Sequence, residues 1–497
     1  MVPILVLALL AIPAADSIAG KRPNVIVILT DDQGYGDLSC HGNPVLKTPN
    51  LDRLHREGAR FVDFHVSPTC APTRSALLTG RHEFRNGVTH TILERERLAP
   101  GAITLADVLK RSGYSTGIFG KWHLGDEETY RPDKRGFAKT FIHGAGGIGQ
   151  SYPGSCGDAP GNNYFDPAIL HDGKFEKTKG YCTDVFFAKA LSWIEAQRGG
   201  TPFFCWISPN APHEPLQVLP EDEARYANKG LTASQAKFFG MVANIDDNVG
   251  RLLAKLQSLG VEKSTLVVFM NDNGGTAGVP VWNSGMRGAK VTPWLGGTRA
   301  SSFWRWPGTI APGDRRQLAA HVDFFPTVAA IAGAAPDARV AAQVEGRSLL
   351  PPLENPAAPW EDRTLFTHVG RWPKGEKVDD WKYIPCSVRT ARWHLVNAPD
   401  PPANSGAKKG SPAPAAKKPG DGKAARLTPP RANWRLFDVD ADPGERTDVR
   451  SQHLEIAARM ESDFDRWWES IKPMLVNETA AGPFENPFKT LYREQFP

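Results

Sequence analysis

The chain has 497 residues, a length that suggests two or three structural units. Of these residues, 41% are hydrophobic and 23% are charged, which is the composition of a soluble globular protein. Six cysteines are too few for a disulfide scaffold of this length. The formal net charge of +5 equals the excess of residues 401–430, which hold six basic residues and one acidic residue. The remainder is therefore neutral overall, which argues against a folded basic surface for nucleic acid.

The first residues have the pattern of a secretory signal. Their apolar run is too short to cross a bilayer comfortably, and Ser17, Ile18 and Ala19 fit the small-x-small pattern of a cleavage site. We therefore expect a signal peptide over residues 1–19, with an uncleaved anchor or a buried helix as the alternatives. No later run approaches the ~18 apolar residues of a membrane helix. The sequence predicts a secreted or periplasmic protein with no membrane span.

Strand-like and helix-like segments alternate along the first 360 residues. The clearest helices are residues 232–259, with Gly260 as the stop, and residues 182–200, for which Thr183 or Asp184 is the expected N-cap. This alternation predicts an α/β fold, with a large mixed, mostly parallel sheet sandwiched by helices. The strand-like runs are NVIVILTDD (24–32), YSTGIFGKWHLG (114–125), PFFCWISPNAPHEP (202–215) and STLVVFMNDNGG (264–275).

The character of the chain changes after residue 360. Residues 364–370, 387–396 and 434–440 predict short strands, and residues 453–472 predict a late helix. We therefore expect a main domain over residues 20–360 and a smaller C-terminal α+β subdomain over residues 361–497, with a short antiparallel sheet. The low-complexity segment 401–430 is expected to be a disordered surface loop, with a tether to an anionic surface as the alternative.

Residues 140–179 are rich in Gly, Pro, Asn and Asp and predict long loops, with a hairpin at LHDGK (170–174). Long loops in compact domains are commonly functional. We expect this region, together with the C-terminal unit, to determine specificity.

Each of the four strand-like runs ends in polar residues that could bind a ligand or react. These are Asp31 and Asp32, Lys121 and His123, His213, and Asp272 and Asn273. Because ligands of open parallel sheets bind beyond the carboxyl ends of the strands, we expect these side chains to converge. Three carboxylates in one crevice would raise one another's pKa unless a cation neutralised them. All-oxygen ligands select a hard cation, and a flexible carboxylate set favours Ca²⁺ over Mg²⁺. For TDDQG alone, a capped turn is the alternative.

A single cysteine lies in SPTCAPTRSALLTGR (67–81), at the predicted start of a helix that ends at Gly80. A helix N-terminus stabilises negative charge, so Cys70 is a candidate reactive thiolate, with a structural thiol or a disulfide half as the alternative. Cys156 and Cys182 flank an irregular loop and form the expected disulfide, with two plain buried thiols as the alternative.

CAPTRSALLTGR resembles the type I sulfatase signature, Cys-x-Pro-x-Arg followed by Leu-Thr-Gly-Arg. Further blocks similar to sulfatase blocks follow in family order over nearly the whole chain. They are RPNVIVILTDDQGYGDLSCHGNP, TPNLDRLHREGARF, GYSTGIFGKWHLG, MRGAKVTPWLGGTRASSFWRWPG and LFDVDADPGERTDV. The resemblance implies that residues 20–360 form the catalytic domain. It also implies that a separate formylglycine-generating enzyme oxidises Cys70 before folding to formylglycine (3-oxoalanine), whose hydrated aldehyde is the nucleophile.

The resemblance also implies a set of site residues. The calcium ligands would be Asp31, Asp32, Asp272, Asn273 and the formylglycine at position 70. The catalytic residues would be Cys70, Arg74, Lys121, His123, His213 and Lys290. Arg74 would hold the formylglycine, and His123 would orient the second hydroxyl of its hydrate. Lys121 would contact both the formylglycine and the sulfate. His213 and Lys290 would bind sulfate oxygens and assist departure of the leaving group, with His213 the best acid by residue type.

The resemblance thus implies a sulfuric ester hydrolase acting on a sulfated carbohydrate or aryl ester outside the cytoplasm. One alternative is a phosphonate monoester or phosphodiester hydrolase with the same scaffold and the same modified cysteine. The other is a catalytically silent, glycan-binding relative, which would be expected to have lost part of the site. Because Cys70 and every residue of the implied set are present, the sequence favours an enzyme.

Overall fold

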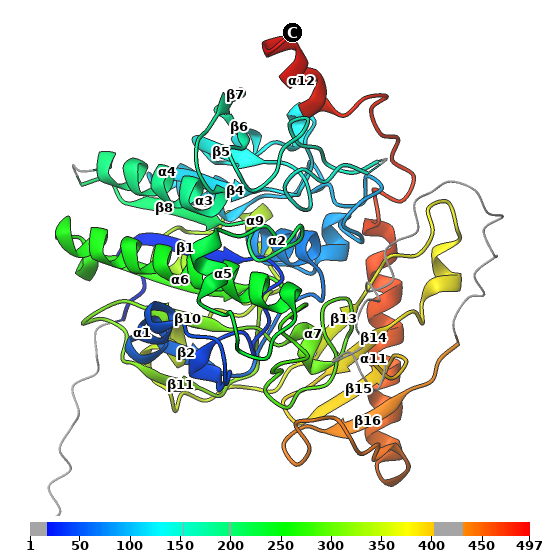
Figure 1. Ribbon diagram of the computed structural model, residues 1–497. Coiled ribbons are helices and arrows are strands. Elements are labelled where there is room, and N and C mark those ends of the chain that lie inside the picture. Colours follow the sequence, from blue (N-terminus) through cyan, green and yellow to red (C-terminus); the bar gives the residue numbers. More distant parts are fainter. Residues whose placement is uncertain (1–16, 153, 198–199, 402–430) are drawn as a thin grey trace, which may run out of the picture.

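Figure 1 shows the computed structural model, which describes residues 17–152, 154–197, 200–401 and 431–497. Most of the predicted signal peptide and residues 402–430 of the low-complexity segment lie outside the described residues. The strands are β1 Asn24–Thr30, β2 Ala59–Phe61, β3 Phe64–His65, β4 Ser115–Lys121, β5 Lys139–His143, β6 Ala168–His171, β7 Lys174–Lys177, β8 Phe203–Ser208, β9 Thr265–Asn271, β10 Ser302–Arg305, β11 Gly313–Arg315, β12 Ala319–Ala320, β13 Leu365–His368, β14 Cys386–Arg389, β15 Trp393–Asn397 and β16 Arg435–Asp438. The helices are α1 Pro49–Glu57, α2 Cys70–Thr79, α3 Leu105–Arg111, α4 Cys182–Ala196, α5 Pro220–Ala224, α6 Ala233–Ser258, α7 Leu295–Thr298, α8 Phe324–Ile331, α9 Ala338–Gln343, α10 Leu350–Glu354, α11 Leu454–Ile471 and α12 Pro487–Gln495.

A ten-stranded sheet forms the centre of the molecule, in the order β11-β2-β10-β9-β1-β8-β4-β5-β6-β7. The strands β9, β1, β8, β4 and β5 are mutually parallel, and β10, β6 and β7 run antiparallel to their neighbours. The four strands predicted from the apolar runs are therefore neighbours in one parallel set. This confirms the predicted mixed, mostly parallel sheet, and it brings the carboxyl ends of these strands to one edge.

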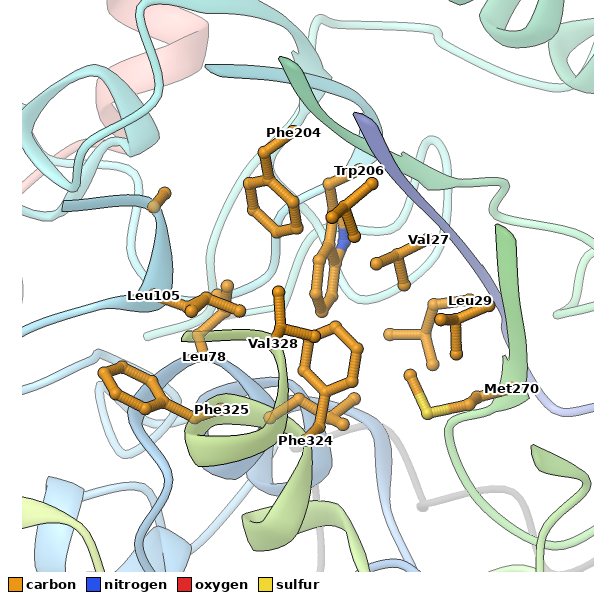
Figure 2. Packing of buried hydrophobic residues seen from close by; sticks show 14 of the residues in the cluster. Val27, Leu29, Leu78, Leu105, Phe204, Trp206, Met270, Phe324, Phe325 and Val328 are labelled. Carbon is orange, nitrogen blue, oxygen red and sulfur yellow. The ribbon is translucent and has the colours of Figure 1, made fainter. Parts of the chain in front are cut away.

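The sheet is covered on both faces because its central strands are apolar throughout. Along β1, Val25, Val27 and Leu29 point to one face and Ile26 and Ile28 to the other, as the twofold period of a strand requires. The first face packs against α2, α3 and α8, and Figure 2 shows the contact of Val27, Leu29, Trp206 and Met270 with Phe324 and Val328. The second face packs against α1, α4 and α6.

The C-terminal part has its own small antiparallel sheet, in the order β13-β14-β15-β16, covered by α11. The segment 387–396 was expected to be one strand, and this is wrong. A turn closed by the Thr390 amide, which donates to the Trp393 carbonyl at 2.8 Å, divides it into β14 and β15. At the end of the chain α12 returns to the large sheet, where Phe488 packs on Phe175 of β7 with ring centroids 5.8 Å apart (Figure 1).

The long predicted helix is α6, whose N-cap Thr232 forms a capping box with Gln235. The expected N-cap of α4 is wrong, because the helix begins at Cys182 and its N-cap is Tyr181. Asp184 lies within the first turn, where its carboxylate accepts a hydrogen bond from Asn248 Nδ2 of α6 at 2.7 Å. The side chain therefore ties two helices together instead of capping one. The hairpin predicted at residues 170–174 is confirmed by β6 and β7.

The expected disulfide between Cys156 and Cys182 is wrong, since every cysteine of the described chain is a free thiol. The two side chains have different surroundings. Cys156 Sγ accepts a hydrogen bond from the Gly125 amide at 3.2 Å, and Cys182, the first residue of α4, packs into the core. The alternative of two buried thiols is the correct one.

The predicted cleavage site lies against the folded chain. Ser17 Oγ donates to Glu354 at 2.7 Å, and Ile18 is 3% exposed. Among the described residues no helix is both long and apolar enough to cross a membrane.

Candidate active site

The carboxyl ends of β1, β4, β8 and β9 meet at one edge of the sheet, and the polar residues predicted to converge are found there. Asp31, Lys121 and Asp272 directly follow or end their strands and are fully buried. Asp32 and His123 have φ of 66° and 60°, a left-handed backbone that few non-glycine residues adopt. Such strained positions occur where the surrounding structure holds a side chain in a functional orientation.

The three carboxylates and the amide of Asn273 form one buried cluster. The Asp32 amide donates to Asp272 Oδ1 at 3.3 Å, and Asn273 Nδ2 donates to Asp32 Oδ1 at 3.0 Å. Two oxygens of the cluster, Asp31 Oδ1 and Asn273 Oδ1, are buried with no hydrogen-bond partner in the described structure. Because buried polar atoms are nearly always satisfied, these oxygens mark a position for a ligand.

Each carboxylate of the cluster has a cationic partner. Lys121 Nζ lies 2.5 Å from Asp31 Oδ2, and Lys290 Nζ lies 2.5 Å from Asp32 Oδ1. The third ion pair joins Arg74 Nη2 and Asp272 Oδ2 at 2.7 Å. Three negative and three positive charges therefore balance.

The pKa values of the carboxyls follow from burial and from these neighbours. Burial raises the pKa of Asp31, and burial together with Asp31 raises the pKa of Asp272 to about 6. Burial would also raise the pKa of Asp32, but Lys290 and His213 outweigh it and lower that pKa below its usual range. Burial therefore disfavours the ionised form of each carboxyl group unless neighbouring cations compensate its charge.

Cys70 is the first residue of α2, and all ten residues of this helix are buried. Its position confirms the predicted helix start. Arg74 lies one turn later on the same face, where its guanidinium reaches Asp272, Ser208 Oγ and the Lys121 carbonyl. The helix therefore presents Cys70 and Arg74 together to the ends of the strands.

The two histidines have complementary hydrogen bonds. His123 Nε2 lies 2.9 Å from the Thr91 carbonyl, which assigns the proton to Nε2 and leaves Nδ1 as a buried acceptor with no partner in the described residues. His213 Nδ1 lies 2.7 Å from the Glu214 carbonyl, and its Nε2 lies 3.7 Å from Asp32 Oδ2. Burial lowers the pKa of His123 well below the ordinary value and lowers that of His213 to about 4.

Two glycines that the sequence reasoning did not single out bring the loop after β5 onto these rings. A Cβ at Gly147 would lie 2.7 Å from His213 Nδ1, and one at Gly146 would lie 3.0 Å from His123 Nε2. The available sequence signal was the glycine-rich run GAGGIG (144–149).

A cavity of about 90 Å³ opens between these groups, and Cys70, His123, His213 and Lys290 line it. Arg371, from the turn after β13, also lines this cavity, although the sequence did not predict it as a site residue. A larger cavity of about 490 Å³ lies between β13 and α11, but no predicted site residue is among its described lining residues. Volume alone therefore does not identify the site.

Comparison with known proteins agrees with this fold. The sulfatase family model matches residues 23–334. N-acetylgalactosamine-6-sulfatase of Mus musculus is 34% identical over 401 residues, covering 74% of this chain and 72% of its own. The crystal structure of Ps i-CgsB in complex with k-i-k-neocarrahexaose superposes with a TM-score of 0.74 at 25% identity, covering 96% of this chain and 98% of that chain. The phosphonate monoester hydrolase of Agrobacterium radiobacter shares the fold, with a TM-score of 0.60 at 17% identity over 91% of this chain and 96% of that chain.

The match over residues 23–334 covers more than half of the chain, and this defines the class of protein. The chain belongs to the sulfatase family, and the relatives that it matches, such as N-acetylgalactosamine-6-sulfatase, are sulfuric ester hydrolases.

Proposed function

We propose that this protein is a calcium-dependent sulfatase, exported from the cytoplasm, that hydrolyses sulfate esters of a carbohydrate with a formylglycine made from Cys70. The observation that carries the proposal is that Cys70, His123, His213 and Lys290 line one small cavity. Lys290 and His213 connect this cavity to the carboxylate cluster through Asp32. The carbohydrate is proposed because the relatives named above include N-acetylgalactosamine-6-sulfatase and a complex with k-i-k-neocarrahexaose.

The residues of the cluster fit a calcium ion. Asp31, Asp32, Asp272 and Asn273 would hold it, because they offer oxygen donors and two of those oxygens have no partner among the described atoms. When bound, the ion would supply positive charge for the sulfate oxygens and acidify a hydroxyl at position 70. The cluster is already neutral with its three protein cations, so a divalent cation would give the site a net positive charge. A site of that charge suits an anionic ester.

The side chains around the cavity support the proposed steps. Formylglycine at position 70 would supply the attacking hydroxyl as a hydrated aldehyde, whose second hydroxyl allows sulfate to leave by elimination. The unpartnered acceptor His123 Nδ1 is suited to orient that second hydroxyl. Lys290 and Lys121 would stabilise charge on the sulfate oxygens. His213 would donate the proton to the leaving oxygen. Burial lowers the pKa of His213 to about 4, and the negative charge of a bound sulfate ester would raise it.

The competing functions differ in substrate, and this allows a direct test. We expect matured protein to hydrolyse 4-nitrophenyl sulfate with a kcat/KM at least about 100-fold above that for bis(4-nitrophenyl) phosphate or an aryl phosphonate monoester. A preference for either phosphorus ester would replace the sulfatase proposal with the hydrolase alternative. Binding of sulfated glycans without turnover of any ester would favour the silent relative.

The calcium proposal makes a separate prediction. Adding Ca²⁺ to chelator-treated protein should raise Tm, and Asn273→Leu, which removes one of the two unpartnered oxygens, should weaken calcium binding at least about tenfold. Calorimetric titration measures the affinity, with Mg²⁺ and Zn²⁺ titrated alongside.

Asn433→Leu is the matched control, since Asn433 is exposed on the segment before β16. Unchanged calcium affinity in Asn273→Leu, or tighter binding of Zn²⁺ than of Ca²⁺, would contradict the proposed site.

A further inference from the structure

Arg371 is a partly buried cation at the active-site cavity that lacks an acidic partner. No carboxylate of the described residues lies within ion-pair distance of its guanidinium, and its Nε is buried without a hydrogen bond. Within the described part of the chain, its side chain makes one hydrogen bond, from Nη2 to Thr91 Oγ1 at 3.2 Å. A buried guanidinium with unused donors is costly unless a ligand pairs with it.

The backbone holds this side chain firmly at the cavity. Gly370 and Arg371 have φ of 66° and 64°, and a Cβ at Gly370 would lie 1.9 Å from the Thr89 carbonyl oxygen. On the other side, Arg95 Nη1 donates to the Trp372 carbonyl at 2.6 Å and its guanidinium stacks on the Trp372 ring. The turn is therefore pinned to residues 89–95, and its left-handed conformation at a non-glycine residue is the kind of strain found at functional positions.

Thr91 is hydrogen-bonded both to Arg371 and to His123, one of the proposed catalytic residues. The Thr91 carbonyl accepts from His123 Nε2, while its hydroxyl accepts from Arg371. Arg371 lines the same cavity as Cys70 and Lys290, yet Lys290 is paired with Asp32 and Arg371 has no such partner. The cavity therefore has one cation paired within the cluster and one available for a ligand.

We propose that Arg371 binds a second anionic group of the substrate, a sulfate or a carboxylate carried by the same sugar residue as the scissile sulfate ester. This rests on the proposed sulfatase function and narrows its substrate class from sulfated carbohydrates to polyanionic ones. A planar guanidinium with unused N–H groups matches both anions, because each can accept two parallel hydrogen bonds.

The test compares three kinds of substrate in wild-type protein and in Arg371→Met. The first kind is a hexoside whose only charged group is one sulfate ester. The second is a hexoside with another sulfate at a neighbouring position, and the third is a hexuronide with one sulfate. Within each kind, the position of the sulfate ester on the ring is varied. We expect wild-type kcat/KM to be at least about tenfold higher for one of the two dianionic classes than for the matched hexoside of the first kind. Arg371→Met should lower that ratio at least about tenfold, with most of the change in KM. Which dianionic class responds distinguishes a sulfate from a carboxylate.

Arg392→Met is the control, because Arg392 is a surface arginine of the same C-terminal part with a side chain 58% exposed. It should leave the substrate ratio unchanged. Calorimetric binding of the preferred dianionic sugar to Cys70→Ala protein, with and without Arg371→Met, provides a readout that does not depend on turnover.

The outcomes separate the inference from the function on which it rests. An equal loss in Arg371→Met for 4-nitrophenyl sulfate and for the dianionic sugars would mean that Arg371 contacts the scissile sulfate, which overturns the inference and leaves the sulfatase proposal intact. A wild-type protein with no preference for dianionic sugars would also overturn it. Failure of matured wild-type protein to hydrolyse any sulfate ester would overturn both.

Discussion

Cys70→Ala should lower hydrolysis of 4-nitrophenyl sulfate by on the order of 10⁵-fold while the protein still folds. The reason for the loss is that the proposed nucleophile is made from this side chain. The fold should survive because Cys70 is a small residue and the first residue of α2, where alanine is a good helix former. Steady-state kinetics measures the loss, and circular dichroism with thermal unfolding checks the fold.

Cys386→Ala serves as the matched control, since Cys386 is a buried thiol of β14 in the small C-terminal sheet. It should retain wild-type kcat/KM. The chemical state of position 70 is a second measurement. The tryptic peptide of residues 61–74 should contain aldehyde in place of thiol when the protein is made in a host with the maturing enzyme. Active protein with only thiol at position 70 would refute the formylglycine mechanism.

Arg74→Met should lower the free energy of unfolding by about 3–5 kcal/mol and also lower activity by more than about 100-fold. Arg74 is 1% exposed, and its guanidinium pairs with Asp272, whose pKa burial already raises to about 6. Methionine fills a similar volume but leaves that carboxylate without its cation. Urea unfolding of the variant and the wild type at pH 7 measures the change.

Arg392→Met is again a suitable comparison, because its pair with Asp438 lies at the surface. Loss of an exposed ion pair should change the free energy of unfolding by less than about 1 kcal/mol. Equal effects of the two substitutions would show that Arg74 does not compensate buried charge, and would contradict the description of the cluster given above.

Much of the central sheet was predictable from the sequence, because its central strands are continuous apolar runs that end in polar residues. The runs at 24–32 and 264–275 became β1 and β9, which are neighbours, so Asp31 and Asp272 were expected to meet. A helix start at Cys70 was likewise predictable from Pro72 and from the apolar residues that follow. These are local signals, and the parallel topology converts them into one site.

Other features depend on contacts that no local pattern encodes. Arg371 reaches the cavity because its turn is pinned to residues 89–95, and a lone arginine after a short strand carries no such signal. The N-cap of α4 was mispredicted because Asp184 lies within the first turn, where its carboxylate accepts a hydrogen bond from Asn248 of α6. The expected disulfide failed for a similar reason, since the loop path places Cys156 beside Gly125. The domain boundary expected at residue 360 stays a prediction.

The complete burial of α2 also sets an order of events during biosynthesis. Leu77 and Leu78 of α2 pack in the same core as Phe325 and Val328 of α8, a helix that lies about 250 residues further along the chain. At ordinary translation rates this leaves roughly 10 to 50 s between the emergence of α2 and that of α8, against which α2 packs. A maturing enzyme would have that interval in which to reach an extended Cys70. Thiol protein that has already folded should therefore resist conversion until it is unfolded again.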